Sequence, residues 1–284
     1  MQKNESITVI GGDARMGYAA RALERAGYFV THIGFERSGN EPAGDRAGNE
    51  GYSSGAYLLP MPLTKDGKNV FAPFSGRTLP LSETQRRIPD GATVFFGGGG
   101  AFGRDLRLRG VTTVDYAADE TLQRKNAALT AEGLLALFIA ETPYSIKKAP
   151  VAVTGGGRVA YETARLFAAC GAAPVCFARR EAQLSELRKA GIRAMPLSAL
   201  GTIETRFVSV VNTVPARILN ASVLRALGRD CVILEAASAP GGADPAEAAA
   251  YGLRLVPAPA LPGRFCPESA GLNIADAVME KLGR

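Results

Sequence analysis

The sequence predicts an α/β protein built from two doubly wound, parallel-sheet domains that are joined by a long linker helix. Both halves of the chain begin with a β-branched run, a glycine-rich turn and a segment whose apolar residues have helical spacing, which is the pattern of a Rossmann-like βαβ unit. The chain has 284 residues, of which 46% are hydrophobic. This length and composition suffice for two domains with a hydrophobic core each.

The first domain is predicted over residues 1–118. Apolar residues at helical spacing from Tyr18 to Ala26 predict a helix that ends at Gly27. Residues 38–55 are rich in glycine, asparagine and charge, and we expect a loop there. Strands are expected at residues 6–10, 29–33, 56–59, 92–96 and 111–115.

The linker helix is predicted over residues 119–143. Apolar residues recur at helical spacing through this segment, and Pro143 ends the pattern. Thr130 and Gly133 lie inside it and are expected to bend or break the helix near its middle. The position of the helix between two α/β segments makes it a natural connection between domains.

The second domain is predicted over residues 144–266, and a C-terminal helix within residues 267–284 is expected to return to the linker helix or to the first domain. That last segment is amphipathic, so one of its faces must be buried. In the second domain, strands are expected at residues 151–154, 174–177, 207–211, 232–235 and 253–256, and helices around residues 159–169 and 182–190.

Charge and composition exclude several classes of protein. The chain carries 33 lysines and arginines against 27 aspartates and glutamates, but these are scattered, which favours a solvated surface over a nucleic-acid interface. No apolar run approaches the roughly 20 residues of a membrane span, and no secretory signal is present, so we expect a soluble cytoplasmic protein. The four cysteines lack metal or redox spacing, and we expect reduced structural thiols and no metal site.

The glycine-rich turn of the second domain matches the dinucleotide-binding fingerprint at Gly155, Gly157 and Ala160. In this pattern the first glycine permits the tight turn, the second lets the backbone approach a pyrophosphate, and the third small residue lets the helix pack closely on the sheet. The helix N-terminus then offers free N–H groups to the phosphates. The sequence therefore predicts cofactor contacts at Gly155, Gly156, Gly157, Arg158 and Val159.

The residues after the next strand distinguish between two cofactors. A carboxylate there would bind the ribose of NAD, but Arg179 and Arg180 occupy the position and Glu181 comes too late. A guanidinium group donates two parallel hydrogen bonds to a phosphate. This favours NADP over NAD; the alternative is two surface arginines at a helix start.

The glycine-rich turn of the first domain departs from the fingerprint, because Asp13 stands at the second glycine's place. A carboxylate there would repel a pyrophosphate. Arg15 offers the opposite charge in the same turn. Two interpretations stay open: these residues bind an anionic substrate, or they form an internal ion pair.

Several blocks of the chain resemble the A-subunit family of dipicolinate synthase, and they occur in that family's order over essentially the full length. The opening Gly11-Gly12-Asp13-Ala14-Arg15 and the block from Ser238 to Gly242 make the resemblance specific. The other blocks are Ala131-Glu132-Gly133, Asn212-Thr213-Val214-Pro215, Ala258-Pro259-Ala260-Leu261-Pro262-Gly263 and Ala270-Gly271. The resemblance implies oxidation of dihydrodipicolinate to dipicolinate with NADP, performed with a flavoprotein-like B-subunit. The substrate would come from the lysine branch, and the product would serve spore formation in a mother cell.

Ligands of doubly wound sheets bind outside the carboxyl ends of the strands, and this places the remaining candidates. Asn212, Thr213, Val214 and Pro215 are expected at the ribose or nicotinamide of the cofactor. The predicted substrate contacts are Asp13, Arg15, Gly98, Gly241 and Gly242, and the predicted catalytic residues are Ser238 and Glu132. Glu132 would take a proton as the ring becomes aromatic; a helix-capping or salt-bridge role is its alternative.

Two other classes of function stay open. A hydroxyacid-dehydrogenase type of oxidoreductase would normally pair a late histidine with a carboxylate, and the single histidine here, His32, is early and is interpreted as structural. A non-catalytic nucleotide-binding protein is the other class, because no residue is an unambiguous acid, base or nucleophile. A homo-oligomer is compatible with either.

Overall fold

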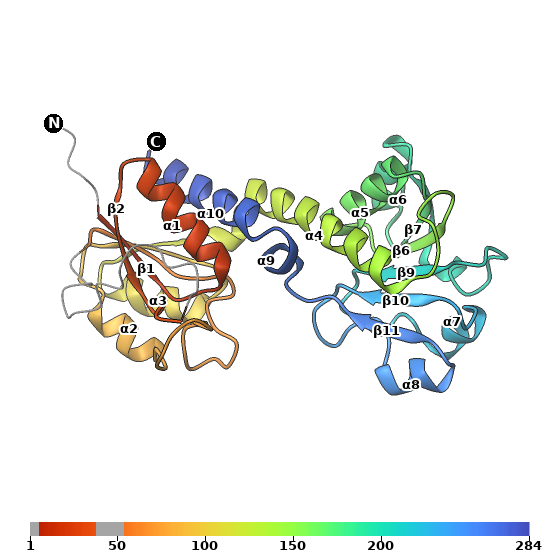
Figure 1. The fold of residues 1–284 in the computed structure, drawn as a ribbon, viewed down its shortest axis with the longest axis horizontal. Helices are drawn as coiled ribbons and strands as arrows, with labels where there is room; N and C mark the ends of the chain where they lie inside the picture. The colour runs from red at the N-terminus through yellow and green to blue at the C-terminus, as the bar shows by residue number, and fades with distance from the viewer. Residues whose placement is uncertain (1–5, 38–53, 284) are drawn as a thin grey trace. The chain divides into compact units, whose positions relative to one another are not determined.

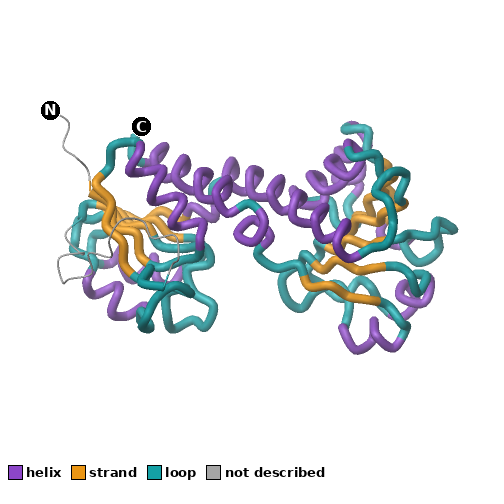
Figure 2. Tube along the Cα trace, viewed as in Figure 1, coloured by secondary structure: helices purple, strands orange, loops and turns teal. Residues whose placement is uncertain are grey.

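The computed structural model describes residues 6–37 and 54–283, which form two compact units (Figure 1). Unit 1 holds the described residues up to Asn126 and those from Cys266 onward, and unit 2 is Ala127–Phe265. Each unit is organised around one parallel sheet with helices outside it (Figure 2). The prediction of two doubly wound, Rossmann-like domains is therefore confirmed.

The sheet of unit 1 has the strand order β2-β1-β3-β4-β5, with all neighbours parallel. This is the flavodoxin-like order, in which β2 is added on one side of β1 and the later strands are added on the other side, so the switch point lies between β1 and β3. The strands are β1 (Ser6–Ile10), β2 (Phe29–Ile33), β3 (Ala56–Leu58), β4 (Thr93–Phe96) and β5 (Thr112–Asp115). Most of the loop expected at residues 38–55 lies outside the described residues.

Helices cover both faces of this sheet. Helices α1 (Ala14–Arg25) and α10 (Pro267–Lys281) pack on the face that carries Val9, and α3 (Gly100–Leu108) packs on the opposite face. A Cβ atom at Gly271 of α10 would overlap the backbone of α1, so the glycine permits the close contact of these two helices. The short helix α2 (Leu81–Arg87) precedes β4.

The sheet of unit 2 has the order β11-β10-β9-β6-β7-β8, again all parallel. Read from β8, this is the strand order of dinucleotide-binding domains, and its switch point lies between β6 and β9. The strands are β6 (Pro150–Thr154), β7 (Ala173–Ala178), β8 (Arg193–Pro196), β9 (Ser209–Asn212), β10 (Val232–Glu235) and β11 (Arg254–Pro257). Helices α5 (Arg158–Ala169) and α6 (Glu181–Lys189) cover one face, and α7 (Ala221–Ala226) and α8 (Pro245–Ala250) cover the other.

Helix α4 (Glu120–Glu141) starts in unit 1 and ends in unit 2, and it is continuous. The expected break at Thr130 and Gly133 was wrong. A Cβ atom at Gly133 would lie 2.7 Å from Cβ of Leu261, in the short helix α9 (Leu261–Phe265). The glycine therefore serves close packing inside unit 2 and does not interrupt the helix.

No helix in the described part of the chain combines the length and the apolar character needed to cross a membrane. None of the four cysteines forms a disulfide within the described residues. Burial raises the pKa of the Cys176 and Cys231 thiols to about 12, so both stay protonated near neutral pH.

Because His32 on β2 is buried, we expect the folded protein to become less stable in acid. Its exposure is 1%, its Nε2 has no hydrogen-bond partner among the described residues, and burial, with the charge of Arg21, lowers its pKa from 6.5 to about 4. Between these values the unfolded chain binds a proton that the folded chain does not. We therefore expect the free energy of unfolding to fall by about 2 kcal/mol from pH 8 to pH 5 through this group.

Denaturant unfolding at both pH values, for the wild type and His32→Leu, measures this contribution. His32 is the single histidine of the chain, so no other imidazole titrates in this range. The variant is expected to lose less stability than the wild type on going to pH 5. An equal loss in both proteins would contradict the prediction.

Candidate functional site

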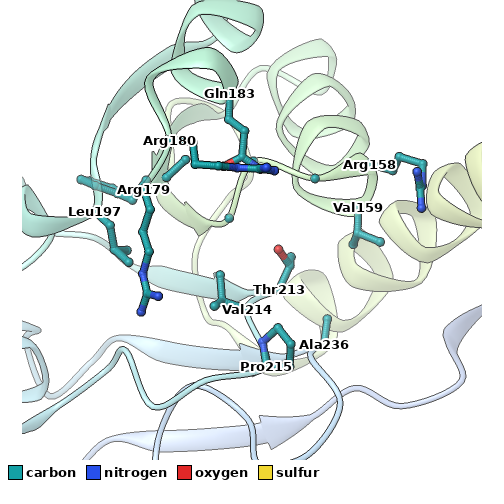
Figure 3. A pocket seen from close by; sticks show the side chains of 15 residues that line it. Arg158, Val159, Arg179, Arg180, Gln183, Leu197, Thr213, Val214, Pro215 and Ala236 are labelled. Carbon is teal, nitrogen blue, oxygen red and sulfur yellow. The ribbon is translucent and has the colours of Figure 1, made fainter.

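A pocket of about 550 Å³ opens at the carboxyl ends of β6, β7 and β9, where the strand order of unit 2 reverses (Figure 3). It is lined by Gly155, Gly156, Gly157, Arg158, Val159, Phe177, Ala178, Arg179, Arg180, Gln183, Leu197, Thr213, Val214, Pro215 and Ala236. Ten of the eleven predicted cofactor contacts are in this set. The exception is Asn212.

The glycine-rich turn shapes one wall of the pocket. Gly155 has φ +107°, and a Cβ atom there would overlap the hydroxyl oxygen of Thr213, so both the backbone conformation and the space require glycine. Thr213 in turn donates its hydroxyl to the carbonyl of Thr154 at 2.6 Å, which fixes it beside the turn. A Cβ atom at Gly157 would meet no protein atom within 4 Å. The space beside the Cα atom of Gly157 is therefore not occupied by any described protein atom.

Gly157 is also the N-cap of α5, with φ −91°. The first N–H groups of a helix lack partners inside the helix, and the helix dipole makes this end positive. An open glycine at the start of a twelve-residue helix is thus a place where a phosphate can approach the backbone. This geometry fits the pyrophosphate of a dinucleotide.

The opposite wall is basic. Arg179 and Arg180 are exposed, their side chains border the pocket (Figure 3), and no hydrogen bond or ion pair joins their guanidinium groups to any other described residue. Glu181 instead accepts a hydrogen bond from Arg188 at 2.7 Å on the surface of α6. Among the lining residues that the structure describes, none is an aspartate or glutamate. The wall therefore offers cations to a phosphate and no carboxylate to a ribose.

Asn212 lies beneath the pocket and not on its surface, so its predicted direct contact with a cofactor is corrected. The residue is fully buried. Its Oδ1 accepts hydrogen bonds from the hydroxyl of Thr154 at 2.6 Å and from the Val214 amide at 3.2 Å. Its Nδ2 donates to the Val214 carbonyl at 3.0 Å and to Oε1 of Glu235 at 2.6 Å. All its hydrogen-bonding positions are thus used inside unit 2.

Glu235 completes this network, and it was not among the residues predicted from the sequence. Its Oε1 also accepts from the Ala237 amide at 3.1 Å, and its Oε2 accepts from the Gly242 amide at 2.7 Å. Thr154, Asn212 and Glu235 are paired in register at the ends of β6, β9 and β10. Each of the three ends a strand in the sequence, but only the strand order and register bring them together, so the network could not be found from the sequence alone.

The turn after β10 is therefore held by a carboxylate. Gly241 has φ +75°, and its amide donates to the Ser238 carbonyl at 3.0 Å. Gly242 is buried, and its amide is already given to Glu235, so its predicted role as a substrate contact is corrected to a structural one. Ser238 is exposed on this turn. Glu132 is exposed on α4 in the same unit and does not line the pocket.

In unit 1, the structure shows the internal ion pair between Asp13 and Arg15. Nε and Nη2 of Arg15 each donate to one oxygen of Asp13 at 2.9 Å, and Nη2 also donates to the Met61 carbonyl at 2.6 Å. Arg15 is only 7% exposed. Of the two open interpretations, the internal pair is thus the one present, and it braces the loop after β3.

The first glycine-rich turn is covered by the chain's own residues. The Gly12 amide donates to the Phe71 carbonyl at 2.7 Å, and a Cβ atom at Gly11 would lie 2.9 Å from Cβ of Ala72. This turn therefore leaves no room for a pyrophosphate. Gly98 is exposed after β4, and its amide donates to Oδ1 of Asp115 at 3.0 Å.

Known proteins are similar to this chain in both sequence and fold. A family model described as the N-terminal domain of the dipicolinate synthase A-subunit matches residues 6–116. The dipicolinate synthase A-subunit of Bacillus subtilis (strain 168) is 30% identical over 282 residues, which are 97% of this chain and 95% of that protein.

Solved structures also show this similarity. The crystal structure of the dipicolinate synthase A-subunit from Bacillus halodurans has a TM-score of 0.86 and 27% identity, and the match covers 100% of this chain and 99% of that one. A transhydrogenase from Sinorhizobium meliloti has a TM-score of 0.68 at 14% identity, over 98% of this chain and 92% of that one, which shows a common fold.

Proposed function

The chain belongs to the dipicolinate synthase A-subunit family, and we propose that it oxidises dihydrodipicolinate to dipicolinate with NADP. We further propose that it acts with a flavoprotein-like B-subunit, in the cytoplasm of a mother cell during spore formation. The name of the Bacillus subtilis relative supports the product and the existence of a second subunit. The dehydrogenase-like fold supports an oxidoreductase.

The pocket of unit 2 fits the cofactor. Gly157 gives a pyrophosphate access to the backbone at the start of α5, and Val214, Pro215 and Ala236 form an apolar wall beyond it. When bound, NADP supplies a hydride acceptor. Beneath this wall, the Thr154–Asn212–Glu235 network holds the backbone at Val214, and its Glu235 holds the amides of Ala237 and Gly242. In this proposal Asn212 is a positioning residue.

Loss of hydride from a dihydropyridine ring creates an aromatic ring, so the chain has to supply orientation and a proton acceptor more than electrophilic help. We assign the role of proton acceptor to Glu132, an exposed carboxylate of α4, and a substrate-orienting role to Ser238, on the exposed turn that Glu235 holds. Because Arg15 is bound to Asp13 and Met61, its contribution is to shape unit 1.

The carrying observation is the basic, carboxylate-free wall at Arg179 and Arg180. It predicts that the wild type binds NADPH at least about tenfold more tightly than NADH, because a charge-assisted bond to the 2′-phosphate is gained. Arg179→Ala should remove most of this preference and leave the NADH affinity unchanged. Isothermal titration measures both constants. Arg193→Ala, which removes an exposed charge away from the pocket, is the matched control.

Equal affinities of the wild type for NADPH and NADH would refute the assignment of NADP. The reaction itself is tested by mixing the chain, with and without the flavoprotein-like partner, with enzymatically generated dihydrodipicolinate and NADP. The expected result is product absorbance in the ultraviolet together with NADPH. Product formed by the partner at the same rate without this chain would leave only a nucleotide-binding, non-catalytic role.

A further inference from the structure

A second pocket of about 580 Å³ lies in unit 2 next to the first, and the two share Ala178, Arg179 and Leu197. Its far side is formed by the segment after β9 and by the start of α7, with Arg217 among the lining residues. Arg179 is the one described cation that lines both pockets. Arg179 therefore lies at the boundary between the two pockets, and one ligand could extend from the first pocket past Arg179 into the second.

The second pocket is positively charged. Arg179 and Arg217 line it, and no carboxylate does so within the described ranges 6–37 and 54–283. Among the residues that the structure describes, Arg217 has one weak ion-pair partner, Asp244, at 3.8 Å, and both side chains are about half exposed (45% and 50%). An exposed pair at this distance contributes little, so Arg217 can turn to a stronger anion at small cost.

The polar groups around the pocket differ in availability. Asn220 and Ser222 bond to each other at 2.7 Å, and Asn220 also caps α7, so both are engaged. Asp244 accepts two amide hydrogen bonds at the start of α8, which keeps it in place if Arg217 leaves it. Ser198 is exposed on the pocket rim and offers a hydroxyl donor. Two guanidinium groups and a hydroxyl are suited to a phosphate monoester.

Resting on the proposed use of NADP, we propose that the second pocket is the 2′-phosphate subsite, in which Arg179 and Arg217 bind the phosphomonoester from two sides. Arg217 is then a specificity-determining residue, 38 positions along the chain from Arg179 and on the loop of another strand. A dianion between two cations is held more firmly than by either alone. Arg180 lines only the first pocket and is not part of this subsite.

The test is isothermal titration of the full chain with 2′,5′-ADP and with 5′-AMP, for the wild type, Arg217→Ala and the control Arg193→Ala. Arg217→Ala should weaken 2′,5′-ADP binding about tenfold and leave 5′-AMP unchanged, whereas the control should change neither. Combining Arg179→Ala with Arg217→Ala should cost less than the sum of the single effects, because both residues bind one phosphate. Thermal unfolding checks that the variants are folded.

The outcomes separate the two proposals. If the wild type binds both nucleotides equally, the assignment of NADP is wrong and the subsite falls with it. If the wild type prefers 2′,5′-ADP and Arg217→Ala keeps the full preference, only the second-pocket subsite is overturned. If the effects of the two arginines are additive, they do not share a phosphate, which also overturns it.

Discussion

Replacing Gly157 with alanine is expected to lower the affinity for NADPH about 100-fold while the protein stays as stable as the wild type. The backbone at Gly157 has φ −91°, which alanine adopts freely, and the new Cβ would meet no protein atom within 4 Å. The methyl group would instead occupy the space through which a pyrophosphate approaches the start of α5. A 100-fold change is about 2.7 kcal/mol of binding free energy. Isothermal titration and thermal unfolding measure the two quantities.

Two other glycines serve as controls for this experiment. Gly76→Ala adds a methyl group to open space in unit 1, and it should change neither affinity nor stability. Gly155→Ala should reduce both, because its φ is +107° and its Cβ would overlap Thr213. Unchanged NADPH affinity in Gly157→Ala would remove the glycine-rich turn from the binding site.

The two strands that are followed by a glycine-rich turn and a helix could be predicted from the sequence alone. A β-branched run followed by glycine and helical spacing is a local signal, and it places β1, β6 and their helices to within a few residues. Helices α2, α7, α8 and α9 have five to seven residues, too few for a period of 3.6 to show, and β8 is a four-residue edge strand. Strand order also escaped prediction, because no local pattern specifies which strand is the neighbour of β1.

The same distinction holds for the site. The phosphate turn at Gly155 and the arginines after β7 are contiguous in sequence, so their roles could be inferred from spacing. The role of Asn212 could not, because its partners Thr154 and Glu235 are 58 and 23 residues away and meet it only through strand register. The partner of Arg15 at Met61, 46 residues away, escaped for the same reason.

Replacing Asn212 with aspartate is expected to lower the free energy of unfolding by about 4 kcal/mol at pH 8. The substitution keeps the acceptor oxygen that faces Thr154 but replaces the Nδ2 donor with a second oxygen. In the wild type Nδ2 donates to the Val214 carbonyl and, at 2.6 Å, to Oε1 of Glu235, so the new oxygen would face two other oxygens. Two carboxylates in this part-buried contact repel each other when both are ionised, so one pKa of the pair rises above its value in the unfolded chain. The folded variant then holds a proton that the unfolded chain releases as pH rises. Stability relative to the wild type should therefore improve from pH 8 to pH 5.

Asn220→Asp is the matched control, because it makes the same chemical change where only the acceptor is used. Asn220 caps α7 by accepting hydrogen bonds from the Val223 amide at 3.3 Å and from the Ser222 hydroxyl at 2.7 Å, and aspartate can accept both. Its stability should stay within about 0.5 kcal/mol of the wild type at both pH values. Denaturant unfolding at pH 8 and pH 5 separates the two variants. If Asn212→Asp matched Asn220→Asp, the amide of Asn212 would not be the donor that joins β9 to Glu235, and the pocket floor would be held by the backbone alone.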